Sequence, residues 1–168
     1  QTCALPIFVV YGAGGAARAI AVELGLAGVG QLTLVNRSAE RGEALLKILR
    51  DRLRLNASLV RWEGDHVVPP DTDVVINSTS IGLYDAEARV PLAVDSLRPG
   101  MVVADVIFSP PQTRLLRDAR SRGCQTLDGL GMIVNQGVIG VQYWTGLEPD
   151  AQVMRVAVAE ALGVPVEG

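Results

Sequence analysis

The sequence predicts a doubly wound α/β domain, in which a mostly parallel β-sheet carries helices on both of its faces. Two observations support this prediction. Short apolar runs alternate along the chain with segments of helical periodicity, which is the pattern of successive βαβ units. A glycine-rich turn also stands between the first apolar run and the first helical segment.

The individual elements follow from the local patterns. Strands are expected where aliphatic and β-branched residues form short runs, and helices where apolar residues recur every three or four positions. The predicted strands are 8–11, 32–35, 58–62, 73–76, 101–105 and 125–127, and the predicted helices are 15–27, 38–53, 113–122, 132–143 and 150–162. Ser38 is expected to cap the second helix. The segment 91–99 is predicted to be a loop with one helical turn.

The first seven residues, Gln1 to Ile7, are similar to the translated end of a common sequencing-library adapter. We expect them to be a scar rather than native sequence, so they are left out of fold reasoning. The alternative is a native lead-in to the first strand. Residues 8–168 are then expected to form one domain of ordinary size.

Composition excludes several classes of protein. With 49% apolar and 20% charged residues, the chain is expected to be globular. A net charge of -3 without a basic stripe argues against a nucleic-acid partner, and no apolar run approaches the roughly 20 residues that span a bilayer. Apart from Cys3 in the presumed scar, Cys124 is the only cysteine, so neither a disulfide framework nor a metal cluster is expected.

The glycine-rich turn, Gly12 to Ala17, predicts a Rossmann-like dinucleotide-binding domain. Gly12 permits the tight turn, Gly14 lets the backbone approach a pyrophosphate, and the small Ala17 lets the helix pack close to the strand. The following helix directs unpaired N–H groups and the positive end of its dipole toward the phosphates. An ordinary glycine turn is the alternative, but the strand before it and the helix after it favour nucleotide binding.

The end of the second predicted strand indicates which nucleotide is bound. NAD-binding domains usually have Asp or Glu there, whereas this chain has Asn36-Arg37-Ser38, with Arg41 one helical turn further on. Arginine offers a planar fork of donors that suits a phosphate, so the pattern favours NADP. The alternative is a solvated arginine pair at a helix start.

A polar run, Asn77-Ser78-Thr79-Ser80, follows the fourth predicted strand. That strand is expected to lie beside the first, across the reversal in strand order where open α/β sheets bind ligands. Taken alone, such a run equally satisfies backbone groups at a strand end.

Together with two further blocks, these motifs resemble the C-terminal half of the shikimate dehydrogenases. The blocks, in matching order and spacing, are Gly12 to Ala16, Asn36 to Arg41, Asn77 to Leu83, Asp105 to Phe108 and Asp128 to Gly137. The resemblance implies NADPH-dependent reduction of 3-dehydroshikimate to shikimate, a cytoplasmic step of aromatic amino-acid biosynthesis, and is compatible with a homodimer.

The resemblance also implies roles for individual residues. Gly12, Ala13, Gly14, Gly15 and Ala16 would hold the pyrophosphate, and Asn36, Arg37, Ser38 and Arg41 the 2′-phosphate. Thr79, Val106, Gly129 and Met132 would line the nicotinamide end, with Phe108 and Gln136 on the substrate.

Two departures from the family qualify this reading. Phe108 stands where the family usually has Tyr, so a hydroxyl is lost and quinate or another ring hydroxy acid becomes an alternative substrate. The family's Lys and Asp for proton transfer come from an N-terminal domain that this chain lacks. Lys47 is expected on a solvated helix face and His66 on the surface, so no catalytic residue is assigned.

Two hypotheses from other classes stay open. One is an NADP-binding module without turnover, such as a redox sensor. The other is the cofactor domain of a glutamyl-tRNA reductase, against which the low positive charge and the block from Gly129 to Gln136 argue.

Overall fold

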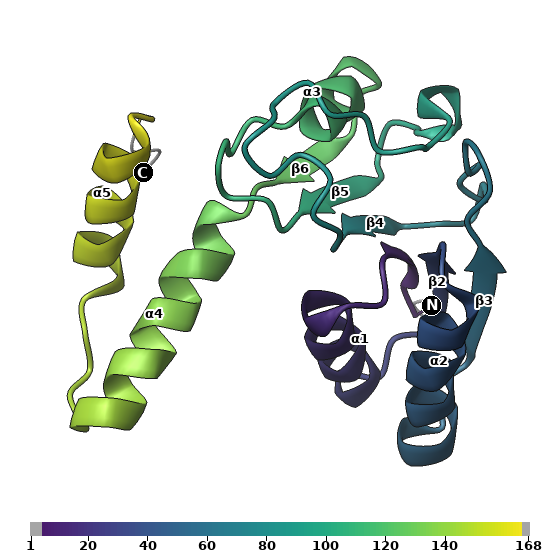
Figure 1. The fold of residues 1–168 in the computed structure, drawn as a ribbon, viewed down its shortest axis with the longest axis horizontal. Helices are drawn as coiled ribbons and strands as arrows, with labels where there is room; N and C mark the ends of the chain where they lie inside the picture. Colours follow the sequence, from purple (N-terminus) through teal and green to yellow (C-terminus); the bar gives the residue numbers. More distant parts are fainter. Residues whose placement is uncertain (1–4, 166–168) are drawn as a thin grey trace.

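The computed structural model describes residues 5–165, which contain a six-stranded, all-parallel sheet with the order β3-β2-β1-β4-β5-β6 (Figure 1). The strands are β1 (Ile7–Tyr11), β2 (Gln31–Asn36), β3 (Ala57–Arg61), β4 (Val74–Asn77), β5 (Val102–Asp105) and β6 (Gln125–Leu127). The strand order reverses between β1 and β4, which are hydrogen-bonded neighbours. The predicted fold class and the position of the fourth strand are confirmed.

Five α-helices and one short 3₁₀ helix connect and follow the strands. They are α1 (Gly15–Leu26), α2 (Ala39–Leu53), η1 (Val94–Ser96), α3 (Arg114–Ser121), α4 (Leu130–Thr145) and α5 (Ala151–Leu162). The N-caps of α2, α3 and α5 are Ser38, Thr113 and Asp150, and each side chain accepts a backbone N–H of the first turn. The single turn η1 lies inside the predicted loop 91–99, as expected.

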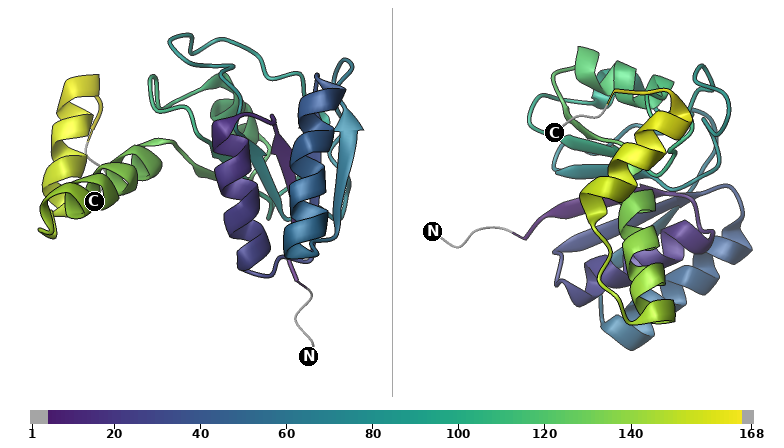
Figure 2. Two further views of the ribbon diagram at one scale, coloured as in Figure 1. Left: turned by 60° about the horizontal axis from the view of Figure 1, so that its bottom comes forward. Right: turned by 90° about the vertical axis from the view of Figure 1, so that its left-hand side faces the viewer.

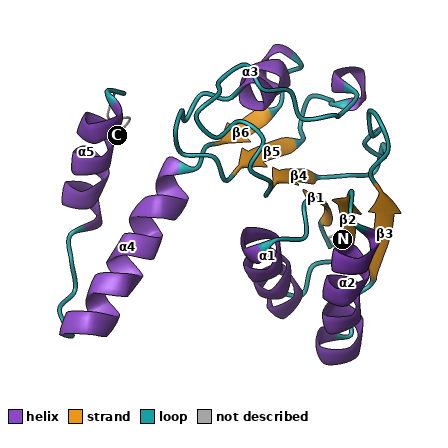
Figure 3. Cartoon of the chain, in the orientation of Figure 1, coloured by secondary structure: helices purple, strands orange, loops and turns teal. Residues whose placement is uncertain are grey.

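Each face of the sheet is covered separately. On one face α1 and α2 lie side by side, and their apolar residues pack with Val10 and Leu34 from the sheet (Figures 1 and 2). The other face packs Val9 and Val103 against α3 and the long loops between β3 and β5 (Figure 3). Because all strands are parallel, their carboxyl ends share one edge of the sheet. The loops from this edge carry the predicted motifs.

The sheet starts one residue earlier than predicted. Ile7, the last residue of the presumed scar, pairs with Gln31 of β2, and its backbone N–H donates to the Asp73 carboxylate over 2.8 Å. Positions 1–4 lie outside the described residues.

Helices α4 and α5 form a hairpin that projects away from the sheet (Figures 1 and 2). The two helices pack on each other, but each has a single fully buried residue, Val134 in α4 and Ala159 in α5. The exposed large apolar side chains of the hairpin are Met132, Ile139, Tyr143, Trp144, Leu147 and Val153. No helix among residues 5–165 combines the length and the apolar character needed to cross a membrane.

Candidate nucleotide-binding site

The turn between β1 and α1 has the geometry that its glycines predict. Gly12 has φ +108, and a Cβ there would lie 3.1 Å from the Ser78 hydroxyl oxygen and 3.2 Å from Thr79 Cγ2. Only glycine fits this backbone conformation and this close approach without strain. By contrast, a Cβ on Gly14 or Gly15 would meet no atom within 4 Å. The backbone at the start of α1 is therefore open to a ligand.

The first turn of α1 is also free to bind an anion. Gly14 is its N-cap and supplies no side-chain acceptor. The N–H groups of a helix's first turn lack intrahelical partners and lie at the positive end of the dipole. Ala17 is fully buried behind this turn, which lets α1 approach the sheet as predicted.

A cavity of about 350 Å³ joins the glycine turn to α2. Its lining residues are Ala13, Gly14, Gly15 and Arg18 from the turn and α1, and Arg41, Ala44 and Leu45 from α2. Two motifs that lie about 25 residues apart in the sequence thus border one cavity. No sequence pattern marked Arg18, although its position four residues after Gly14 places it one helical turn from the glycines that are predicted to hold the pyrophosphate.

The remaining residues predicted for the 2′-phosphate shape the turn between β2 and α2. The Asn36 side-chain amide donates to the Ser38 carbonyl over 2.7 Å, and the Ser38 hydroxyl accepts the Arg41 backbone N–H at 3.3 Å. Arg37 is exposed and is not among the residues that line the cavity. The geometry therefore brings Arg41, but not Arg37, together with the glycine turn.

Asn77 at the end of β4 organises the loop that follows. Its side-chain oxygen accepts the Thr79 N–H at 3.1 Å and the Thr79 hydroxyl at 2.7 Å. Its side-chain N–H₂ group donates to the Ile81 carbonyl at 3.2 Å and to the Asp105 carboxylate at 2.9 Å. Thr79, which is predicted to line the nicotinamide, is therefore held in place by a buried amide.

Asp105 is the centre of this network, and the sequence analysis gave it no role. Its carboxylate is 2% exposed and accepts the Asn77 amide, the Ile107 N–H at 3.1 Å and the Thr113 hydroxyl at 2.8 Å. Burial raises the pKa of Asp105 to about 6, although the three donors oppose the shift. The network ties the loops after β4 and β5 to the start of α3.

The start of α4 packs against the loop after β5. A Cβ on Gly129 would lie 2.5 Å from the Ile107 carbonyl oxygen and 2.7 Å from that of Val106, so only glycine fits there. Val106 and Gly129, both predicted at the nicotinamide, are thereby brought together. Met132 and Gln136 are exposed and four residues apart, so they lie on one face of α4.

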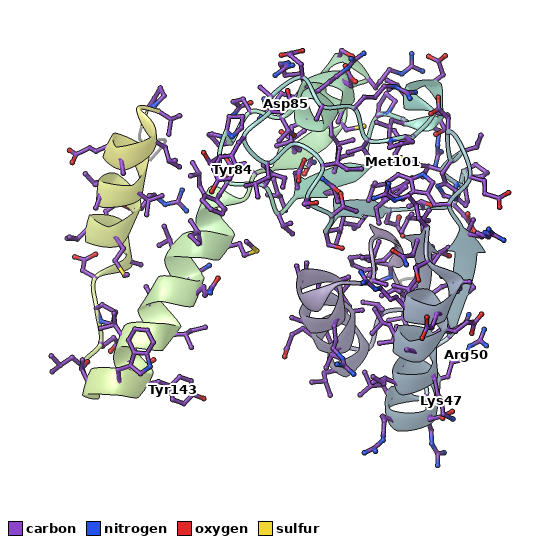
Figure 4. All side chains as sticks on the ribbon, viewed as in Figure 1. Lys47, Arg50, Tyr84, Asp85, Met101 and Tyr143 are labelled. Carbon is purple, nitrogen blue, oxygen red and sulfur yellow. The ribbon has the colours of Figure 1, made fainter. Side chains whose placement is uncertain are left out.

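The two titratable residues that were set aside behave differently from each other. Lys47 points into solvent from α2, as expected (Figure 4), and its Nζ lies 2.6 Å from an Asp51 carboxylate oxygen. The prediction of a surface position for His66 needs correction, because this residue is half-buried and its Nδ1 lies 2.7 Å from the hydroxyl of the buried Tyr11. Burial lowers the pKa of His66 and favours its neutral form.

Comparison with known proteins adds independent information. Residues 129–158 match the family model of the shikimate 5′-dehydrogenase C-terminal domain. The NADP⁺-dependent shikimate dehydrogenase of Methanopyrus kandleri is 36% identical over 157 residues, which is 92% of this chain and 54% of that protein. The chain is a relative of the shikimate dehydrogenases.

Solved structures agree with this relationship. A shikimate dehydrogenase in complex with NADP⁺ matches with a TM-score of 0.84 and 34% identity, covering 95% of this chain and 56% of that one. The ligand-free 5-ketofructose reductase of Gluconobacter sp. strain CHM43 matches with a TM-score of 0.89 and 49% identity, covering 94% and 57%. The chain thus spans about half the length of the shikimate dehydrogenase relatives it matches.

Proposed function

We propose that this chain is the NADP-binding part of a shikimate dehydrogenase-like oxidoreductase. The observation that carries the proposal is the single cavity bordered by the open glycine turn and by Arg41. Backbone N–H groups suit a pyrophosphate and a guanidinium group suits a 2′-phosphate. The end of β2 bears Asn36 in place of the carboxylate that would repel this phosphate.

The residues of this chain bind and orient the cofactor. Gly12 to Ala16 hold the pyrophosphate, and Asn36, Ser38 and Arg41 surround the 2′-phosphate. Arg37, which is exposed and does not line the cavity, is proposed to contact the same phosphate from the solvent side. Thr79, Val106, Gly129 and Met132 frame the nicotinamide end. NADPH, when bound there, supplies a hydride to a substrate carbonyl. The proton for the carbonyl oxygen would come from a group that is not among these cofactor-binding residues.

The first candidate reaction is the reduction of 3-dehydroshikimate to shikimate. It is favoured by the motif order and by the match of residues 129–158 to the family model. Phe108 and Gln136 are then the residues of this chain that contact the substrate.

The second candidate is the reduction of a sugar ketone, and a specific observation favours it. The chain is 49% identical to 5-ketofructose reductase, against 34% to the shikimate dehydrogenase solved with NADP⁺. Phe108 lacks the hydroxyl that shikimate dehydrogenases usually present to their substrate. The activity assay should therefore include hydroxylated ketones other than 3-dehydroshikimate, among them 3-dehydroquinate, the ketone that corresponds to quinate.

The decisive experiment uses the protein expressed from the genomic copy of its gene. NADPH absorbance is followed with 3-dehydroshikimate, 3-dehydroquinate and 5-ketofructose, and each assay is repeated with NADH. We expect one ketone to be reduced with a clear preference for NADPH. Tight NADPH binding without turnover of any ketone would instead favour the non-catalytic module, and equal use of both cofactors would contradict the NADP assignment.

The proposed function also has consequences for the cellular location and the oligomeric state of the protein. A small-molecule reductase that consumes NADPH is proposed to work in the cytoplasm and to need neither a membrane nor a nucleic acid. A homodimer is also proposed. Static light scattering of the complete protein then gives twice the subunit mass, whereas a monomer mass contradicts the dimer.

A further inference from the structure

Arg18 lies on α1, one helical turn after Gly14, the N-cap of that helix. Its backbone N–H donates to the Gly14 carbonyl over 3.0 Å. Its exposed side chain lines the same cavity as Gly14 and Arg41. With a rise of about 1.5 Å per residue, Arg18 stands about 6 Å along the helix axis from Gly14. It is thus set back from the N–H groups that suit a pyrophosphate.

The opposite wall of the cavity comes from α2. Arg41, Ala44 and Leu45 line it, and their spacing of three and four residues places them on one face of that helix. The two helices lie side by side on one face of the sheet (Figures 1 and 2). Two guanidinium groups, one from each helix, therefore border one cavity.

These two arginines have no counter-ion among residues 5–165. Neither Arg18 nor Arg41 forms an ion pair with a carboxylate there, so both guanidinium groups are available to a bound anion. Two like charges that share a cavity repel each other, and an anion bound between them removes that cost. The arrangement suits a ligand with a dianionic group on the α2 side of the glycine turn.

We propose that Arg18 is a specificity-determining residue of the 2′-phosphate site, which it completes from the α1 side opposite Arg41. This inference rests on the proposed function, since it assigns a further residue to the same cofactor. Arg18 then contributes to the preference for NADPH over NADH. A contact with the pyrophosphate would instead support both cofactors equally, because both contain that group.

The test measures nucleotide binding to the full chain by titration calorimetry, with NADPH, NADH, adenosine 2′,5′-bisphosphate and adenosine 5′-monophosphate as probes. Arg18→Ala should weaken the two ligands that carry a 2′-phosphate by about tenfold or more, as expected for a lost charge-assisted hydrogen bond. The other two probes should change less than about twofold. Arg18→Lys keeps the charge without the planar fork and should show an intermediate loss.

The matched control is Arg52→Ala, which removes an exposed arginine from the last turn of α2, the helix that carries Arg41, at a position that does not line the cavity. It should leave all four affinities unchanged. Equal losses for NADPH and NADH in Arg18→Ala would overturn the inference in favour of a pyrophosphate contact, and no loss would overturn it in favour of a solvated side chain. If the unmodified chain itself does not prefer NADPH, the proposed cofactor is wrong and the inference falls with it.

Discussion

The sheet region, residues 7–127, buries most of its large apolar side chains, whereas the α4–α5 hairpin, residues 130–162, exposes many of its own. In the sheet, Leu34 and Val103 are 0% exposed because helices or loops cover both faces. In the hairpin, Tyr143 and Trp144 are each 85% exposed. The Tyr143 side chain projects from the end of α4 in Figure 4. The sheet region completes its own core, whereas the hairpin presents apolar surface that residues 5–165 do not cover. Exposed apolar surface of this kind marks interaction sites.

The difference between the sheet region and the hairpin predicts that residues 8–168 bind the cofactor but do not catalyse the reaction. Residues 8–168 alone should bind NADPH, because the glycine turn and Arg41 lie in the sheet region. They should not transfer hydride to 3-dehydroshikimate or 5-ketofructose. Loss of the general acid or base alone typically lowers the rate 10²- to 10⁴-fold. Loss of the residues that orient the substrate against the cofactor lowers the rate further.

The assay follows NADPH absorbance with the chain alone and after mixing with a separately produced N-terminal domain from a close relative. Recovery of activity on mixing would support the prediction. Turnover by residues 8–168 alone at the rate of an intact enzyme would refute it.

Truncation of one buried and one exposed side chain tests the contrast directly. Leu34→Ala removes a fully buried side chain of β2 and should lower the free energy of unfolding by about 2 to 5 kcal/mol. Trp144→Ala in the hairpin should change it by less than about 0.5 kcal/mol in this chain, because little contact is lost. Urea unfolding followed by circular dichroism gives both values. A loss at Trp144 as large as at Leu34 would show that the hairpin is covered after all.

A pH titration of stability tests the network at Asp105. Burial raises the pKa of Asp105 from its ordinary value of 3.8 to about 6, so the folded state favours the neutral carboxyl more than the unfolded chain does. The stability that this preference adds is fully present below about pH 4 and is lost as the pH rises through about 6. Between these limits the wild-type chain should lose up to about 3 kcal/mol relative to Asp105→Asn, which does not titrate.

The measurement is urea unfolding of both variants between about pH 4 and pH 7, since all other groups titrate alike in the two proteins. A constant difference across this range would mean that the three hydrogen-bond donors keep Asp105 ionised throughout.

The smallest effect is expected at Phe108, which lies in the loop after β5 and is predicted to contact the substrate. In the complete protein, Phe108→Tyr adds a hydroxyl whose hydrogen bond is worth about 0.5 to 1.5 kcal/mol, or roughly two- to tenfold in the KM for shikimate. Steady-state kinetics with shikimate and with a second hydroxy substrate measure it. An improvement confined to the second substrate would show that the pocket has been rebuilt for another ligand.

Local patterns were sufficient to predict most of the fold. The strands and helices lie within a few residues of their predicted limits, because the apolar periodicity and caps such as Ser38 are properties of short segments. α4 extends further than predicted, from Leu130 to Thr145, since the periodic pattern does not mark its ends. The glycine turn was also predictable, because the conformation that Gly12 needs is a local requirement.

The parts of the site that the sequence did not reveal depend on distant partners. Asp105 meets the Asn77 amide across 28 positions, and Tyr11 meets His66 across 55. Such contacts depend on the exact register of the strands and the path of the loops, which no local pattern encodes. Arg18 was missed for a related reason, because only the packing of α1 beside α2 places it in a cavity with Arg41.

The positions of the chain's two tryptophans give the protein a built-in pair of optical reporters. Trp62 is 7% exposed, its ring centroid lies 5.1 Å from that of Tyr11, and its indole N–H donates to the Pro91 carbonyl. Its emission should therefore be blue-shifted and should report on the integrity of the sheet region. Trp144 is 85% exposed, so its emission should be red-shifted and open to collisional quenchers such as iodide. A partner that covers the hairpin would protect the second signal and leave the first unaltered, which separates docking from folding in one spectrum.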